Sequence, residues 1–431
     1  MPYRLRILKI MVEKSNKKII LIVGKSAKEH ALARWFSMSQ EVEKVYVAPG
    51  STAISEFAEC IDIRENDVSG LFEFAVKNEI DLTIASSIEA INADIAGLFS
   101  ANEQAIFAPE KDNAEFTLSK STAKKLLYRL RIPTAKFGIF DKPNLATDYI
   151  KNCKMPIIIS SDSENENAIR AVVSTHKQAK TVISDLEVQN TNKYIIENYT
   201  YGHNFTLYVI TDGVSALPVG VVGDYKFKEN GDGGLYTLGA AAFSPDYKVS
   251  FDLVGELIEN VVNKIIEDGN SHNKPYFGIL GLECVLKPSG EYFVNNLIPF
   301  TKDHDTQTVL NQLETELLPL LFSCVNGAFS DEYTELPIKD DATVSCVLFS
   351  RKENTVITGL DLVDEDTVVN HFGTNRNAYF EYLTNKGRTL VVTQTASTFT
   401  KAKELLYENI DEIHFNGKSF RADIGKDNIQ Q

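Results

Sequence analysis

Apolar runs alternate with amphipathic stretches over the first hundred residues. Residues 17–24 (KKIILIVG) contain an apolar run that ends in Gly, a helical pattern follows over 29–35, and VEKVYVAPG is a second short apolar run. The same rhythm predicts strands at DLTIASS and AIFAP, with helices over 70–78 and 90–99. Strand and helix in alternation predict a parallel sheet covered by helices, with ligands outside the carboxyl ends of the strands.

The pattern changes after residue 118. A helix begins at Ser119 (SKSTAKKLLYRL) and is stopped by the Ile-Pro that follows, after which short strands and polar loops replace the alternation. YIIENYTY and NFTLYVIT are joined through a Gly, and GILGLECVL and EYFVNNLI through Lys-Pro-Ser-Gly. These segments predict antiparallel strand pairs and an α+β region. Further on, ATVSCVLFS, RTLVVTQTA and the helix FTKAKELLYENI form a third segment.

These changes predict a short extension followed by three folded units. We place the extension at residues 1–16, an N-terminal α/β domain at 17–118, an α+β region at 119–331 and a C-terminal domain at 332–428. A chain of 431 residues is longer than the roughly 250–300 at which a single core stops growing, which favours several domains. The extension lacks the apolar core of a secretory signal, and Met11 is an alternative start.

Composition and charge narrow the functional classes. The formal net charge of -15 argues against nucleic acid as a partner, because phosphate backbones need clustered Lys and Arg. No stretch approaches the about 20 consecutive apolar residues of a membrane span. The five cysteines are scattered without the spacing of a zinc or redox site. We therefore expect a cytoplasmic protein of small-molecule ligands, with neither nucleic acid nor a membrane as partner.

Several phrases, in order over nearly the whole chain, carry a resemblance to one family. VGKSAKEHAL, EKVYVAPGSTA, DLTI and IFAP resemble its VGxGGREHAL, VYVAPGNAGTA, DLTIVGPE and IFGP. SKSTAKKLLYRLRIPTA resembles GSKAFAKDFMARHGIPTA, and IHFNGKSFRADIG resembles IxFxGxxYRxDIG. The chain thus resembles the phosphoribosylamine-glycine ligase (glycinamide ribonucleotide synthetase) family of the ATP-grasp superfamily. The resemblance implies a parallel α/β pre-ATP-grasp domain, an ATP-grasp region of two α+β lobes with the small lobe at about 137–205, and a small β-rich C-terminal domain.

The family's reaction belongs to de novo purine biosynthesis. ATP phosphorylates the carboxylate of glycine, and the nitrogen of 5-phosphoribosylamine attacks the glycyl phosphate to give glycinamide ribonucleotide, ADP and phosphate. The resemblance therefore implies ATP and Mg²⁺ as cofactors, and ATP, glycine and 5-phosphoribosylamine as ligands. No protein nucleophile is required and no catalytic residue is assigned, because such catalysis consists of positioning and of neutralising phosphate charge.

Matching positions give three groups of candidate site residues. Lys120 and Glu197 match the ATP site. The matches to substrate-binding phrases are Gly24, Glu29, His30, Asp224, Lys226, Thr237 and Gly239. The candidate metal ligands are Glu283, Asn296 and Asp303. Glu283 enters this group because GLECVLKPSGEYFVNNLIP also resembles a phrase of aminoimidazole ribonucleotide carboxylase, another ATP-grasp enzyme, and such oxygen ligands suit Mg²⁺.

Other positions depart from the family pattern. Ser160 replaces a lysine that contacts the nucleotide, and Phe227 and Phe300 replace arginines. The family's glycine loop becomes a polar stretch with the acidic residues Asp162, Glu164 and Glu166. Carboxylates repel phosphates, so these changes act against ATP binding. Three hypotheses stay open: a working ligase, a catalytically inactive member that acts as a binding or interaction protein, and an ATP-grasp ligase of altered substrate.

Overall fold

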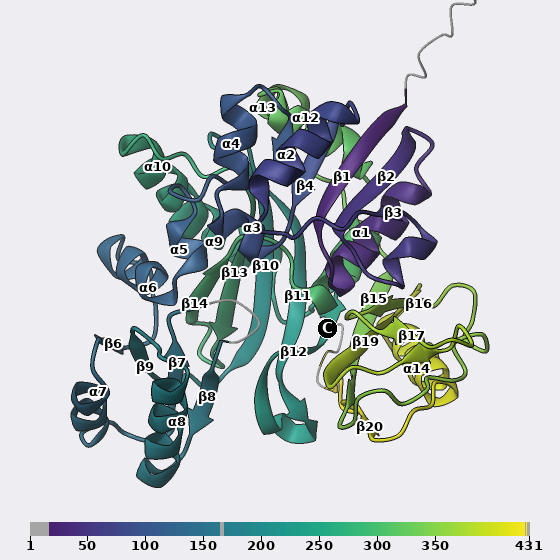
Figure 1. Cartoon of the computed structure of the whole chain (residues 1–431). Coiled ribbons are helices and arrows are strands. Elements are labelled where there is room, and N and C mark those ends of the chain that lie inside the picture. The colour runs from purple at the N-terminus through teal and green to yellow at the C-terminus, as the bar shows by residue number, and fades with distance from the viewer. Residues whose placement is uncertain (1–16, 164–167, 427, 429–431) are drawn as a thin grey trace, which may run out of the picture.

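The computed structural model describes residues 17–163, 168–426 and 428 (Figure 1). The predicted extension with Met11 lies outside the described residues, as do Glu164 and Glu166 of the acidic stretch.

The N-terminal part forms a five-stranded parallel sheet in the order β3-β2-β1-β4-β5, which confirms the predicted architecture. Its strands are β1 (Lys18–Gly24), β2 (Val42–Pro49), β3 (Glu59–Cys60), β4 (Leu82–Ala85) and β5 (Ile106–Phe107). The connecting helices are α1 (Ala27–Ser37), α2 (Val68–Lys77), α3 (Ile88–Asn92) and α4 (Ile95–Ala101). Residues 20–23 of the central strand β1 are fully buried, because helices cover both faces of a parallel sheet.

A small antiparallel sheet follows, in the order β6-β9-β7-β8. Helices α5 (Glu115–Leu118) and α6 (Lys120–Arg129) lead into it. Its elements are β6 (Phe137–Phe140), α7 (Pro143–Ile150), β7 (Ile157–Ser161), β8 (Arg170–Val173), α8 (His176–Val188) and β9 (Tyr194–Asn198). The sheet buries its apolar side chains against α7 and α8. It forms the lower left part of the molecule in Figure 1 and corresponds to the predicted small lobe.

The centre of the molecule is a nine-stranded sheet in the order β14-β13-β10-β11-β12-β15-β19-β16, with β20 paired to β15. Its first five strands in chain order are β10 (His203–Thr211), β11 (Ala216–Glu229), β12 (Gly233–Ser244), β13 (Gly278–Leu286) and β14 (Tyr292–Ile298). The others are β15 (Ala342–Ser350), β16 (Val368–His371), β19 (Gly387–Ala396) and β20 (Lys418–Ser419). The predicted C-terminal strands therefore extend the central sheet, because β15 pairs along the free edge of β12.

Helices pack along this sheet and connect its strands. They are α9 (Phe251–Leu257), α10 (Asn263–Ser271), α11 (Asp303–Gln312), α12 (Leu317–Val325), α13 (Phe329–Glu332) and α14 (Phe399–Glu412). A π-helical segment, Ile258–Val262, joins α9 to α10. The short hairpin of β17 (Asn375–Arg376) and β18 (Tyr382–Leu383) lies beside β16 and contacts the N-terminal part through an Arg376 ion pair with Glu56 (Figure 1).

The chain crosses between the two antiparallel sheets at Gly202, which corrects one predicted strand pair. The pattern pairs YIIENYTY with NFTLYVIT, but β9 pairs with β6 and β7, and β10 pairs with β11 and β13. A Cβ atom on Gly202 would lie 2.4 Å from the carbonyl oxygen of Leu286. The glycine therefore serves a close backbone approach and not a hairpin turn. The other predicted pair, β13 with β14, is confirmed.

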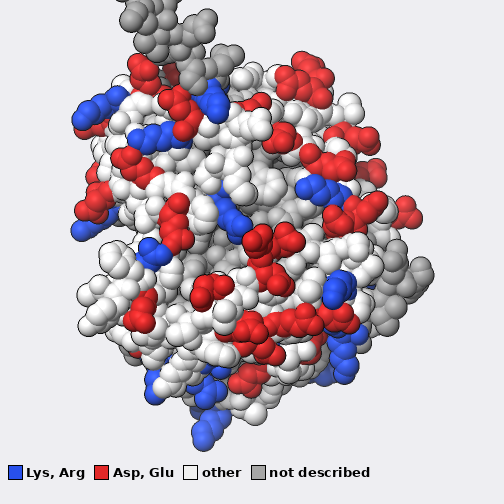
Figure 2. Space-filling model, turned by 90° about the vertical axis from the view of Figure 1, so that its right-hand side faces the viewer, with Lys and Arg blue, Asp and Glu red and all other residues white. Residues whose placement is uncertain are grey.

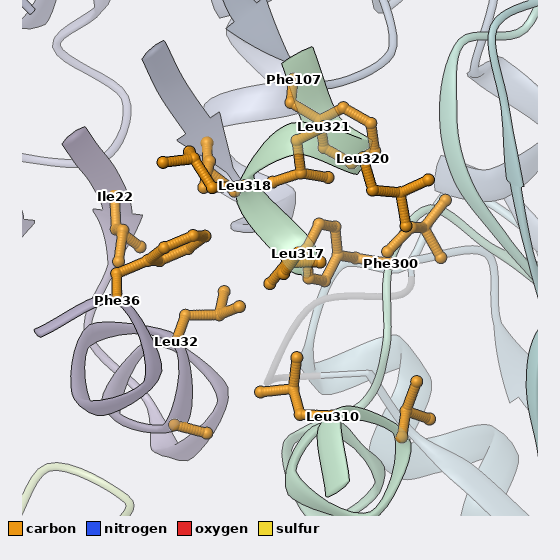
Figure 3. Close-up of a cluster of buried hydrophobic side chains, with 14 of the residues drawn as sticks. Ile22, Leu32, Phe36, Phe107, Phe300, Leu310, Leu317, Leu318, Leu320 and Leu321 are labelled. Atoms are coloured by element: carbon orange, nitrogen blue, oxygen red, sulfur yellow. The ribbon is translucent and has the colours of Figure 1, made fainter. Parts of the chain in front are cut away.

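An apolar cluster joins the N-terminal sheet to α11 and α12 (Figure 3). Ile22 and Phe36 contribute from the N-terminal side, and Leu317 and Leu320 from α12. Phe300, which stands where the family phrase has an arginine, is 6% exposed and packs in this cluster. That position therefore contributes packing instead of a charge for a phosphate.

Acidic side chains gather on the face shown in Figure 2, as a net charge of -15 leads us to expect. Lys and Arg are scattered there, so the coloured residues of this face form no continuous basic surface for a phosphate backbone. In the part of the chain that the structure describes, no helix combines the length and the apolar character needed to cross a bilayer.

Candidate functional site

Two cavities lie side by side against the central sheet, and both are lined by Arg170, Lys226 and Glu283. The first, which we call the turn pocket, has a volume of about 130 Å³. It lies where the β1–α1 turn faces the start of α11, and its lining includes Ser26, Lys28, Ser86, Lys302 and Arg388. The second, which we call the lobe cavity, has a volume of about 20 Å³ between the small and central sheets. Its lining includes Lys120, Glu197, Tyr236, Asn295 and Asn296.

Glu29 and Gly24 build the β1–α1 turn. The Glu29 carboxylate accepts hydrogen bonds from the backbone N–H and the hydroxyl of Ser26, each at 2.8 Å, and from the Ser86 hydroxyl. A Cβ atom on Gly24, whose φ is 148°, would lie 2.3 Å from Cδ of Glu29. The carboxylate therefore occupies the space that the glycine leaves, and it caps α1 from within the chain. The turn keeps its shape with an internal anion at its centre.

His30 lies beneath this turn and is buried. Its Nδ1 accepts the backbone N–H of His371 at 3.0 Å, and its ring packs against Phe57 and the ring of His371. Burial, and after it the charge of Arg34, lowers the pKa of His30 to about 4. The residue therefore joins α1 to β16 as a neutral imidazole and does not line either cavity.

Acid is expected to weaken this contact. The folded pKa of His30 lies below its ordinary value, so the unfolded chain binds the extra proton between about pH 6.5 and pH 4, and stability is lost as the pH falls through that window. Burial lowers the pKa of His371 as well, in the same direction. We expect His30 to account for about 2 kcal/mol of the loss in free energy of unfolding between pH 7 and pH 5.

Urea denaturation at the two pH values measures this loss. His30→Gln should flatten the dependence, whereas His272→Gln, at a side chain that is 61% exposed, should leave it unchanged. An equal pH dependence in the wild type and His30→Gln would show that His30 carries no part of it.

The predicted ATP-site residues Lys120 and Glu197 are bound to each other. The Glu197 carboxylate lies 3.0 Å from the ammonium of Lys120 and 2.5 Å from that of Lys124. All three side chains are at most 3% exposed. Burial opposes ionisation, but the two ammonium groups outweigh it and lower the pKa of Glu197 to about 2, while burial lowers the pKa of Lys124 to about 8. In this buried triad two ammonium groups share one carboxylate of the protein.

Glu283, a predicted metal ligand, is surrounded by cations. Its carboxylate is bound by the ammonium of Lys226, by that of Lys302 at 3.1 Å and by the guanidinium of Arg170 at 3.5 Å. Burial opposes ionisation, but these three cations hold the pKa of Glu283 well below its usual range. Asn296 lies opposite Glu283 across the β13–β14 pair, and both polar atoms of its side chain are buried without a hydrogen-bond partner.

The third predicted metal ligand, Asp303, begins α11 and closes the wall of the turn pocket. It accepts from the Ser26 hydroxyl and from the backbone N–H of Lys28 at 3.3 Å, and it pairs with Arg388 at 3.1 Å. It therefore joins α11 to α1 and β19, and its partners are cations and hydrogen-bond donors. A metal-binding role of Asp303, Glu283 and Asn296 stays a prediction. The cations that contact Asp303 and Glu283 act against it.

Asp224 and Lys226 from β11 belong to the same charge network. The Asp224 carboxylate is bound by Lys226 and Lys302 and lies 3.3 Å from Nε2 of His304. Thr237 donates its hydroxyl hydrogen to the carbonyl of Lys226 at 2.8 Å and accepts the N–H of Gly239 at 3.1 Å. Gly239 packs directly against the His304 ring. These contacts pack β12 against β11 and the start of α11.

A substituted position lies in the wall of the lobe cavity. Tyr236 lines it and packs edge-on against Phe227, with ring centroids 5.3 Å apart. Arg170 lies opposite Ser160 across the β7–β8 pair, and its guanidinium is 6.0 Å from the Tyr236 ring centroid. The chain therefore places a new cation beside the position of the lost lysine, but that cation also reaches Glu283.

The start of the acidic stretch folds back onto α6. The Asp162 carboxylate accepts the backbone N–H of Ser121 at 2.6 Å and the hydroxyls of Ser119 and Ser121, each at 3.0 Å. Lys193 pairs with it at 3.2 Å. An internal carboxylate thus occupies the N-terminal end of this helix, where an anion is favoured.

Sequence comparison with the family did not single out Lys124, Arg170, Lys302 or Arg388. The sequence did contain one sign that Lys302 is unusual. When KDHDTQ (302–307) is aligned with the family's GDPETQ, Lys302 takes the place of a glycine. A new cation in a phosphate-binding phrase could have been tested as a partner for the acids nearby. Arg170 carried no such signal, because only the β7–β8 register brings it opposite Ser160.

Comparison with known proteins identifies the ancestry. The chain matches the phosphoribosylglycinamide synthetase N domain over residues 18–117, the ATP-grasp (A) domain over 118–305 and the C domain over 349–427. The phosphoribosylamine–glycine ligase of Halalkalibacterium halodurans is 29% identical over 423 residues, covering 96% of this chain and 97% of that protein. The enzyme of the same name from Lactococcus lactis is 28% identical over 410 residues, covering 94% and 98%.

The fold agrees with these matches. The crystal structure of phosphoribosylamine–glycine ligase from Thermotoga maritima has a TM-score of 0.77 at 20% sequence identity, covering 94% of this chain and 99% of that one. The three domains of the family match in order, and the relatives are similar over nearly the whole chain. The chain therefore belongs to the phosphoribosylglycinamide synthetase family, whose members are ATP-grasp proteins of purine biosynthesis.

Proposed function

We propose that this chain is a family member that has lost ATP-dependent ligation and acts as a binding protein through its turn pocket. The observation that carries the proposal is the occupation of Glu283, the carboxylate expected to hold a metal, by Lys226, Lys302 and Arg170. A cytoplasmic location is part of the proposal. Membership of the family describes descent, and the site decides activity.

Mg²⁺, which an ATP-grasp family implies, does not fit the residues present. The ion needs several oxygen ligands in near-octahedral geometry, and at least part of its charge must be balanced by carboxylates. The charge of Glu283 is already balanced by three neighbouring cations, and Asp303 is bound to Arg388. A divalent ion at Glu283 would face those cations at short range. Of the three predicted metal ligands, Asn296 supplies a neutral oxygen that has no hydrogen-bond partner.

ATP does not fit the lobe cavity either. A volume of about 20 Å³ admits about one water molecule and no nucleotide. Lys120 is buried against Glu197, so it would have to leave a carboxylate to meet a phosphate. Tyr236 and Arg170 fill the space beside it. The side chains of the protein therefore take the place of the nucleotide.

The turn pocket keeps the means to hold a small anion. Lys25, Lys28 and Arg388 line it, and Lys25 and Arg388 remain 51% and 19% exposed in their ion pairs. The curated relatives are named phosphoribosylamine–glycine ligases. Of the ligands in that name, a phosphorylated sugar amine suits these cations, and we propose that class for the pocket.

An assay of ADP formation tests the proposal. Purified protein is incubated with ATP, Mg²⁺, glycine and freshly formed 5-phosphoribosylamine, beside an active ligase of the family as positive control. We expect no ADP above the background without enzyme. ADP formation that requires all three substrates and is lost in Lys120→Ala would overturn the proposal.

One observation favours the alternative of a divergent working ligase. Lys120, Glu283 and Asn296 line one cavity, and Arg170 supplies a cation opposite Ser160. If the small sheet moved away from the central sheet, these groups would face a nucleotide together. The same assay decides between the two functions, and replacing glycine by other amino acids tests a ligase of altered substrate.

A further inference from the structure

The ammonium of Lys302 lies inside a cage of oxygen atoms. It is bound to Oδ2 of Asp224, lies 3.1 Å from Oε1 of Glu283 and 3.6 Å from Oδ2 of Asp305, and donates to the hydroxyl of Thr206 at 3.3 Å. We propose that these four side chains form a cation site whose resident cation is the side chain of Lys302, which makes the protein independent of a metal ion at this place. We call the four side chains the oxygen cage.

Rigid elements hold the oxygen cage. Thr206, Asp224 and Glu283 come from β10, β11 and β13, which are neighbours in the central sheet, and Thr206 is the register partner of Glu283. Asp305 lies in the first turn of α11, and Lys302 is the residue immediately before that helix. Three strands and one helix therefore aim their oxygens at a single point, which is how proteins build precise cation sites.

The oxygens are those that a hard cation selects. Carboxylates and a hydroxyl are ligands of Ca²⁺ and Mg²⁺, and an ammonium group donates hydrogen bonds to the same atoms. All four side chains of the cage are in residues at most 7% exposed. An uncompensated carboxylate at such a place strongly destabilises the folded state, so a cation must be present.

The charges balance only with Lys302 in place. The three acids of the cage face Lys302, Lys226 and Arg170, which are three cations. His304 lies 3.0 Å from Asp305, and Tyr208 donates to the same carboxylate. Removing the Lys302 ammonium leaves one buried negative charge in excess. A free cation is then the simplest compensation.

This inference explains why the metal expected by descent does not fit, but it does not depend on the proposed function. A protein that formed ADP could still contain a tethered cation in the oxygen cage, and an inactive protein could lack one. The two ideas therefore fail separately.

Thermal unfolding of Lys302→Met tests the inference. Methionine keeps the chain length and apolar stem but removes the charge. We expect the Tm of the variant to fall below that of the wild type, and to recover by on the order of 3 °C with millimolar methylammonium, Mg²⁺ or Mn²⁺, because a ligand that binds only the folded state stabilises it. The Tm of the wild type should not respond to these cations. The matched control is Lys28→Met, since the Lys28 side chain is 15% exposed like that of Lys302 but, among the residues that the structure describes, has only Glu29, at 3.7 Å, as an ion-pair partner.

Two results would overturn the inference. One is a wild-type protein whose Tm rises with Mn²⁺ as much as that of the variant, since its cage would then accept a metal beside Lys302. The other is a folded Lys302→Met that responds to no cation, or responds no more than Lys28→Met. If Lys302→Met does not fold alone, refolding in each cation decides: recovery with a cation supports the cage, and failure with all of them contradicts it.

Discussion

Replacing Glu197 by glutamine is expected to lower the free energy of unfolding by about 3–5 kcal/mol. The substitution removes the carboxylate between Lys120 and Lys124 and leaves two ammonium groups buried without a counter-charge. The loss of one partner of a buried ion pair is costly because the remaining charge cannot return to water. Lys124→Met should cost less, since one lysine then still faces one carboxylate. Urea denaturation at neutral pH measures both.

An exposed glutamate provides the control for this substitution. Glu187→Gln lies on the solvent side of α8 and should change the free energy of unfolding by less than about 0.5 kcal/mol. If Glu197→Gln were as mild as Glu187→Gln, the triad would have to be hydrated or open in solution. Lys120 would then be available to a phosphate, and the argument that it is already occupied would fail.

Gly239→Ala is expected to be the most damaging glycine substitution near the site. A Cβ atom at this position would lie 1.7 Å from Cε1 of His304, whose side chain is completely buried, and the glycine has a φ of 132°. Overpacking and backbone strain each cost about 1–3 kcal/mol, so we expect a loss of about 4 kcal/mol in the free energy of unfolding. Thermal and urea denaturation measure it.

Gly231 is the matched control, because it also has a positive φ, of 66°, but a Cβ atom there meets nothing within 4 Å. Gly231→Ala should therefore cost only about 1 kcal/mol from backbone strain. Gly239→Ala combined with His304→Ala should recover part of the loss if the clash is its cause. Equal losses for Gly231→Ala and Gly239→Ala would mean that the His304 ring does not pack where the structure has it.

The fold was predictable because its signals are local. Local patterns predict these helices and strands without knowledge of distant contacts. They are the apolar run of β1, its alternation with helices, and the short connection between β13 and β14. The pairing of β9 was not predictable in this way. Whether the chain turns back or crosses to another sheet at Gly202 depends on the approach of Leu286, which lies far away in sequence.

The site was predictable in part. Three motif-matched residues, Lys120, Glu283 and Asn296, line one cavity in the structure. The motif matches did not show that Glu197 and Glu283 are already bound to cations of the chain, because ion pairs between β13, β8 and the start of α11 are set by tertiary packing. They also gave Gly24, Glu29 and His30 a ligand-binding role, which stays a prediction; in the structure Gly24 and Glu29 build a capped turn and His30 makes a buried contact. A motif records which residues remain, and only the structure shows which of them are already occupied.

The central claim is that side chains of the protein occupy the place of the nucleotide, and titration calorimetry with MgATP tests it most directly. The account predicts no saturable heat up to millimolar MgATP for the wild type, beside an active family ligase that binds under the same conditions. Saturable binding with one site per chain, abolished by Lys120→Ala, would contradict it.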